Sequence, residues 1–274
     1  MVGAKKSNWW QAKSWFEIVE HAKSIDLAIL PVGSIEQHGP HLPTGDDTYE
    51  IFGICEGVAE RTKAILLPCA WYGSHPYHHL NFPGTIPLTS NTYVTMIREI
   101  VDGASKAGYN KFILLNGHGQ EYSTAYAAQE VGKDGHFCIH VTWWEICKDI
   151  INDTLETTPP RGFSHADECE TSMGLHLFPQ YVDMSKAEKE LPEPLIDRKF
   201  YTGPAGYDVK ELHWYDGTFA RMEYKELKKG IIGDPTKATK EKGEAITKVA
   251  VERVSELIED IMERWPAGEK PPVD

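Results

Sequence analysis

A short loop after an apolar run holds five side chains that can bind a metal ion or transfer protons. The run is LAILPVG, residues 27–33, and the side chains that follow are Glu36, His38, His41, Asp46 and Asp47. In an extended segment, residues two apart point to the same side, so Glu36 and His38 can face one site while Gln37 turns away. The loop therefore predicts part of a metal-binding or catalytic site.

Two further clusters contain residues of the same kinds. In NGHGQE, residues 116–121, Gly117 and Gly119 allow a tight backbone turn that presents the imidazole of His118 at the end of a strand. The third cluster, HADECETS at residues 165–172, is expected to be helical. On a helix Glu168 and Glu170 lie about 200° apart, so only one of them can face a given site.

The chemistry of the three clusters suits a divalent metal ion. Histidine and carboxylate ligands without a nearby thiolate favour Zn, Mn or Fe(II), and Asp47 could bridge two such ions. A lone histidine or carboxylate at a turn is usually a cap or a surface group. Here two separate clusters at strand ends each contain a histidine and flanking glycines. Such a pair is harder to explain as caps or surface groups.

An α/β fold with a mostly parallel sheet is expected to position these clusters. Near-continuous apolar runs at residues 26–33, 64–73, 111–117 and 136–144 predict strands that are covered on both faces. Helices are predicted at residues 48–61, 91–107, 121–131, within 165–178, and at 237–264, and residues 179–236 have no clear period. Ligands of parallel sheets bind beyond the carboxyl ends of the strands, where the first two clusters fall.

Composition narrows the classes of partner. The chain has 274 residues, and Lys+Arg 28 against Asp+Glu 41 gives a net charge of −13, which argues against nucleic acid and anionic membranes. No apolar run approaches the roughly 18 residues of a membrane span, so we expect a cytoplasmic protein. The five cysteines form no CxxC pair, which argues against a disulfide framework. Without a linker or repeat, residues 1–274 are expected to form one domain.

Four segments taken in order resemble the creatininase (creatinine amidohydrolase) family. They are PVGSIEQHGPHLPTGDDT, FPGTI at residues 82–86, NGHG and HADECETS, and the similarity extends over about residues 26–180. The resemblance implies a creatininase-like α/β fold, a metal centre that is often binuclear, a homohexamer built as a trimer of dimers, and hydrolysis of a small-molecule substrate.

The resemblance also implies roles for individual residues. The metal ligands would be Glu36, His38, Asp47 as the bridge, His118 and Glu170, which hold one or two divalent ions per subunit, Zn first and Mn or Fe as alternatives. His165 would move a proton to the leaving group, with Glu168 as a second catalytic residue. His41 and Asp46 would shape the loop.

The chain departs from the family in its expected substrate pocket. Creatininase has Tyr-Glu-Asn after the strand-end histidine, where this chain has Gly119, Gln120 and Glu121. His78 stands where many members have Glu, beside the family histidine His79. The predicted substrate-binding residues are His78, His79, Glu121 and Trp143.

The expected function is hydrolysis of a cyclic or formyl amide, in which a metal-bound hydroxide attacks a carbonyl. An alternative reaction is hydrolytic C–C ring opening of a cyclic polyol diketone, as by a 3-dehydro-scyllo-inosose hydrolase. An alternative of another class is a metal-binding member of the fold that has lost catalysis.

Overall fold

Four parallel strands form the central sheet of the computed structural model, which describes residues 8–75, 79–157, 163–193 and 226–272. The strands are β1 (Leu27–Val32), β2 (Ile65–Leu66), β3 (Lys111–Asn116) and β4 (Phe137–Thr142), in the order β2-β1-β3-β4. Val32 pairs with Asn116, and Asn116 pairs with Thr142, so the carboxyl ends of three strands are level. The predicted parallel α/β fold is confirmed.

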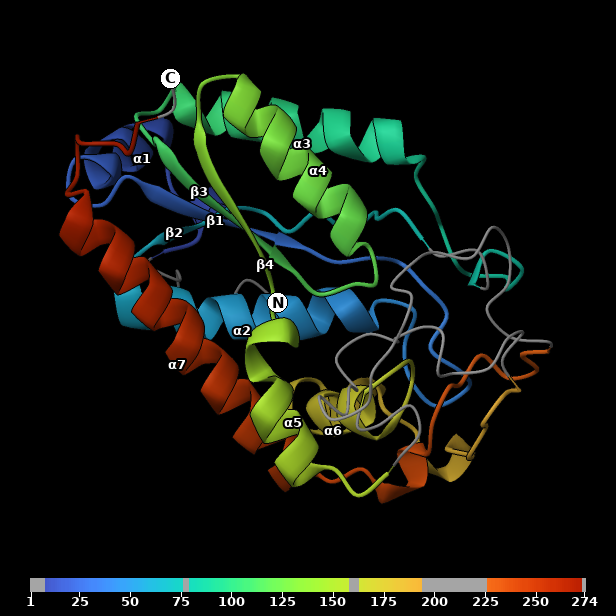
Figure 1. Cartoon of the computed structure of the whole chain (residues 1–274). Helices are drawn as coiled ribbons and strands as arrows, with labels where there is room; N and C mark the ends of the chain where they lie inside the picture. The colour runs from blue at the N-terminus through green and yellow to red at the C-terminus, as the bar shows by residue number, and fades with distance from the viewer. Residues whose placement is uncertain (1–7, 76–78, 158–162, 194–225, 273–274) are drawn as a thin grey trace, which may run out of the picture.

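Helices cover both faces of the sheet (Figure 1). On one face lie α2 (Asp46–Thr62), α5 (Lys148–Thr154), α6 (Glu168–Leu177) and α7 (Lys240–Arg264). On the other lie α1 (Trp15–Ala22), α3 (Ser90–Ser105) and α4 (Glu121–Lys133). Alternate strand residues feed the two cores, since Ile29 packs with the first group and Leu30 with the second. This double cover explains why the strands are apolar throughout.

Most predicted elements appear within a few residues of their expected bounds, with one clear exception. The strand predicted over residues 64–73 is regular only at Ile65–Leu66, because Pro68 has no amide hydrogen to continue the ladder, and a single bridge between Val32 and Ala70 follows. The helices α1 and α5 were not predicted. Short 3-10 helices occur at Trp10–Ala12, Glu145–Cys147, Pro179–Tyr181, Met184–Lys186 and Pro235–Lys237. Within the described ranges, no helix is both long and apolar enough to cross a membrane.

The amino end of α2 packs tightly against the ends of β1 and β3. A side chain at Gly33 would meet the Cα atom of Thr48 at 2.6 Å, and one at Gly117 would meet the carbonyl oxygen of Asp47 at 2.9 Å. The chain leaves β1 toward β2 on one side and later returns to β3 on the other, so this junction is the topological switch point of the sheet. Ligands bind at such points in open parallel sheets.

Candidate metal centre

Four segments bring buried histidines and carboxylates together at the switch point. The loop after β1 supplies Glu36 and His38, α2 supplies Asp47, the loop after β3 supplies His118, and α6 supplies Glu170. Nε2 of His38 lies 3.2 Å from Oδ1 of Asp47 and 3.7 Å from Oε2 of Glu170. Nδ1 of His118 lies 3.0 Å from Oδ2 of Asp47 and 3.5 Å from Oε2 of Glu36. Asp47 therefore lies between two halves of one cluster.

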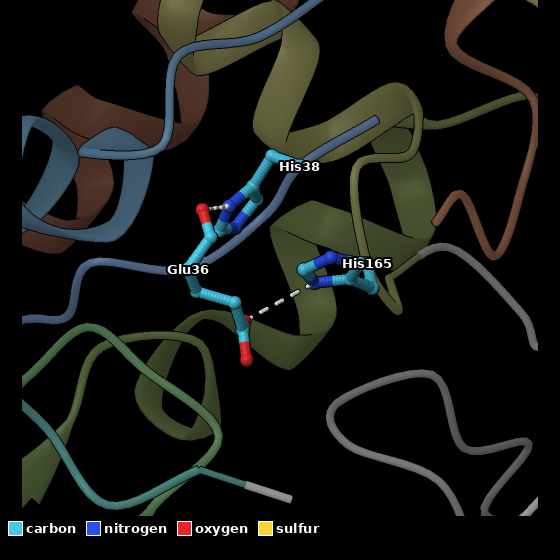
Figure 2. A group of neighbouring side chains, drawn as sticks. All are labelled: Glu36, His38 and His165. Atoms are coloured by element: carbon cyan, nitrogen blue, oxygen red, sulfur yellow. Dashed lines mark hydrogen bonds and ion pairs between the residues drawn. The ribbon is translucent and has the colours of Figure 1, made fainter. Parts of the chain in front are cut away.

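Neighbouring groups fix the orientation of these side chains. Nδ1 of His38 donates to the backbone oxygen of Glu36 at 3.1 Å, as Figure 2 shows, so Nε2 of His38 is the nitrogen that faces the carboxylates. The hydroxyl of Ser34 donates to Oδ2 of Asp47 at 2.5 Å. The backbone amide of Ala166, a residue in the left-handed region at φ 50°, donates to the carboxylate of Glu170. The cluster is thus held in place before any ligand binds.

The electrostatics of the cluster favour a bound cation. Among the described residues, the ion-pair partners of these carboxylates are histidines only. Burial raises the pKa of Glu36 to about 7 despite the opposing effect of His118, and it raises the pKa of Glu170 well above its usual range. For Asp47, burial is outweighed by His38 and His118, which hold its pKa well below the usual range. A divalent ion would supply the missing positive charge.

The residues present fit a metal in number and type. Three groups place one ligand atom of each member within 4.8 Å of the others: Glu36, His38 and His165; Glu36, His75 and His118; His38, Asp46 and Glu170. Within the part of the chain that the structure describes, both carboxylate oxygens of Asp46 are buried without a hydrogen-bond partner, and so are the Nε2 atoms of three histidines, His38, His75 and His118. Nitrogen and oxygen donors of this kind suit Zn or Mn.

Sequence reasoning missed two members of these groups. Asp46 was expected to shape the loop, yet its carboxylate lies 3.9 Å from Nε2 of His38, and burial raises its pKa to about 8. His75 was not among the predicted site residues, although it lies close to the predicted pair His78 and His79 in the sequence. The doubled Asp in GDDT and the third His in GSHPYHH were the available signals.

A second set of histidines adjoins the carboxylate of Glu36. Nδ1 of His165 lies 3.6 Å from Oε2 of Glu36 (Figure 2). Its Nε2 donates to the backbone oxygen of Gln37 at 2.7 Å. The rings of His79 and His165 are 4.0 Å apart, and Nε2 of Gln37 donates to Nδ1 of His79 at 3.0 Å. The expectation that Gln37 turns away was wrong, because β1 ends at Val32 and residues 36–38 do not follow strand geometry.

Glu168 is not brought to the cluster. Its carboxylate accepts hydrogen bonds from the backbone amides of Glu156 and Thr157, at 3.1 and 2.7 Å, and pairs with Nζ of Lys242 at 2.5 Å. Asp167 caps the helix, and from there Glu168 and Glu170 diverge around its axis. The structure therefore does not support the predicted catalytic role of Glu168. Its side chain instead links α6 to α7 through Lys242.

The predicted substrate-binding residues have different positions. Only His79 lies against the cluster. Trp143 is fully buried in the core, where its ring packs 5.5 Å from that of Phe163, so the structure does not support contact with substrate. Glu121 begins α4 and is half-buried, and it belongs to none of the three ligand groups of the described chain. His78 lies outside the described residues.

Comparisons with known proteins agree with this geometry. A family model described as creatininase, creatinine amidohydrolase, matches residues 11–258. The chain is 33% identical over 274 residues to the 3-dehydro-scyllo-inosose hydrolase of Thermotoga maritima, covering 97% of this chain and 87% of that protein. A crystal structure of creatinine amidohydrolase matches with a TM-score of 0.75 and 26% identity, over 95% of this chain and 99% of that one. A manganese form of creatininase matches with a TM-score of 0.74 and 25% identity, over 94% and 99%.

Proposed function

The chain belongs to the creatininase family of hydrolytic enzymes, and on that basis we propose that it is a metal-dependent hydrolase of a small cyclic molecule. The observation that carries the proposal is the position of Asp47, whose two carboxylate oxygens lie 3.2 Å from His38 and 3.0 Å from His118. A carboxylate in that position can be shared by two cations. The proposed ligands are Glu36, His38, Asp47, His118 and Glu170.

A divalent ion at this site would activate a water molecule and polarise a carbonyl group of the substrate. The protein's own contribution to proton transfer is assigned to His165. Because Nε2 of His165 donates to the Gln37 backbone, Nδ1 is the nitrogen that faces the cluster and can carry a proton to the leaving atom. The backbone oxygen of Gln37 and the ring of His79 hold that imidazole in place from its other side.

We favour a cyclic polyol diketone as the substrate. The support is the relationship to the 3-dehydro-scyllo-inosose hydrolase, which extends over nearly the whole chain at 33% identity. Water would add to a ring carbonyl, the adjacent C–C bond would break to give a carboxylate, and the enolate carbon would take a proton from His165. The imidazole of His79 lies beside the cluster, where it can contact a ring hydroxyl.

Hydrolysis of a cyclic or formyl amide is the second candidate. It is supported by the close match to the structure of creatinine amidohydrolase, with a TM-score of 0.75. Against creatinine itself, Gln120 stands where creatininase has a Glu, and its amide is hydrogen-bonded to the backbone of Gly33 and Ser74. A site without that carboxylate differs from creatininase next to the metal.

The substrate proposal is tested by assaying the purified, metal-loaded protein on three compounds. These are 3-dehydro-scyllo-inosose, creatinine and a formamidopyrimidine, each followed by mass spectrometry of the product. We expect ring opening of the inosose, with addition of one water, and little turnover of the two amides. Turnover of an amide at a higher kcat/KM would contradict the substrate assignment, and turnover of none with metal bound would favour the non-catalytic alternative.

A further inference from the structure

His75 has the position of a metal ligand, although no prediction assigned it a role. Its side chain is completely buried, and Nδ1 donates to Oε1 of Glu36 at 3.0 Å. Its ring lies 4.6 Å from the ring of His118. Its other nitrogen, Nε2, has no hydrogen-bond partner among the described residues. The nitrogen that faces Glu36 and the neighbouring candidate ligands is Nδ1.

The surroundings of His75 match one metal coordination group. Ligand atoms of Glu36, His75 and His118 lie within 4.8 Å of one another, and Nδ1 of His118 lies 3.5 Å from Glu36 and 3.0 Å from Asp47. The hydrogen bond from His75 to Glu36 requires a proton on Nδ1. Metal binding displaces such protons from its ligands, so this contact is compatible with a shared cation.

Gln120 and Gly73 explain how the loop delivers His75 to this position. Oε1 of Gln120 accepts from the amide of Ser74 at 2.9 Å, and Nε2 of Gln120 donates to the carbonyl of Gly33 at 3.1 Å. A side chain at Gly73 would meet the oxygen atoms of Gln120 and Gly33 at 2.7 and 3.0 Å. Gln120 therefore holds the segment before His75 against the end of β1. Both the oxygen and the nitrogen of its amide take part in this contact.

Resting on the proposed function, we propose that His75 is a nitrogen ligand of the metal ion that Glu36 and His118 hold. Gln120 is then a positioning residue that fixes the loop carrying this ligand. Because imidazole is neutral, the ion keeps more of its positive charge than it would with a carboxylate in that place, which favours activation of water.

The test compares metal binding by the wild type, His75→Ala and His75→Gln, with His140→Gln as the control. His140 is a half-buried histidine whose Nε2 bonds the Thr142 hydroxyl outside the cluster. Each full-length protein is stripped with a chelator and checked for folding by circular dichroism. It is then titrated with Zn²⁺ by calorimetry and with Co²⁺ by visible absorption, which reports the coordinating atoms.

We expect both His75 variants to bind one of the zinc ions at least about tenfold more weakly, and to show altered Co²⁺ bands, because a ligand is lost. The control should match the wild type. Zinc affinity within twofold of wild type in both variants would overturn the ligand role. Weaker binding with an unchanged Co²⁺ spectrum would overturn it too, since His75 would then only orient Glu36. A wild type that binds neither ion would instead overturn the proposed function itself.

Discussion

The carboxylate of Asp47 lies 3.0 Å from Nδ1 of His118, so the first turn of α2 meets the loop after β3. The contact is possible because residue 117 is a glycine. A Cβ atom at this position would lie only 2.9 Å from the backbone oxygen of Asp47 in α2. Both side chains are almost completely buried. Segments that are distant in sequence therefore share one buried polar site.

Replacement of Asp47 by Asn should remove most of the bound metal. An amide carries no negative charge, and Asp47 is the carboxylate that faces both His38 and His118. We expect zinc affinity to fall by at least about a hundredfold, measured by competition with a chelating dye. Asp134→Asn, at a surface pair with Arg98, is the control and should bind normally. Normal affinity in Asp47→Asn would show that the cluster is not held together by a shared cation.

Replacing each of two neighbouring glutamates on α6 by Gln should have a different effect. Glu170→Gln should weaken metal binding, because Glu170 lies 3.7 Å from Nε2 of His38. Glu168→Gln should keep the metal and lower the free energy of unfolding by about 3 kcal/mol, because Lys242 loses its buried partner. Chelator competition and urea unfolding measure the two effects. Loss of metal from Glu168→Gln with stability retained would place the wrong carboxylate in the site.

His165→Ala should keep the metal and lose turnover. Its Nδ1 faces the cluster while its other nitrogen is bound by the Gln37 backbone, as proton transfer requires. We expect kcat to fall by about 10² to 10⁴ on whichever substrate the wild type hydrolyses. His140→Ala serves as the control. Metal loss in His165→Ala would mean that this histidine is itself a ligand, and full activity would mean that another group carries the proton.

The metal-free protein should become less stable as pH rises from about 6.5 to 8.5. Burial raises the pKa of Glu36 to about 7 and that of Asp46 to about 8, so the folded state keeps protons that the unfolded state has released. Although burial opposes it, Asp47 raises the pKa of His38, which acts in the same direction. Burial lowers the pKa of His75 to about 4. This shift makes the stability rise with pH, but mainly below pH 6.5.

Thermal unfolding with chelator present checks this pH dependence. We expect Tm to fall across the range, and the fall to shrink in Asp46→Asn, which removes one of the titrating acids. Added Zn²⁺ should reverse most of the fall, because a bound cation stabilises the ionised carboxylates. A metal-free Tm that is constant or rises over the same range would contradict the electrostatics assigned to the cluster.

The sequence predicted those parts of the protein that local patterns determine. Apolar runs at residues 27–32 and 111–116 became buried parallel strands, and the polar residues after them met at the sheet edge, as strand ends in parallel sheets do. The helical spacing of Glu168 and Glu170 correctly separated their directions. These results depend on periodicity and on the position of glycines.

Other features depend on tertiary contacts that no local pattern contains. His75 reaches Glu36 only because Gln120 clamps the preceding residue to β1, and those segments are far apart in sequence. Trp143 directly follows β4 but packs inward against Phe163. The side chain of Gln37 bonds His79 because the loop after β1 leaves strand geometry. Each of these outcomes was decided by packing between elements.

The most direct test of the central claim is the metal content of the purified chain, measured by elemental mass spectrometry after dialysis. The account predicts at least about one tightly bound divalent ion per wild-type chain, and near-complete loss in Glu36→Ala and His118→Ala. A wild type without bound metal, or an unchanged metal content in both variants, would contradict the assignment of this cluster as a hydrolytic metal centre.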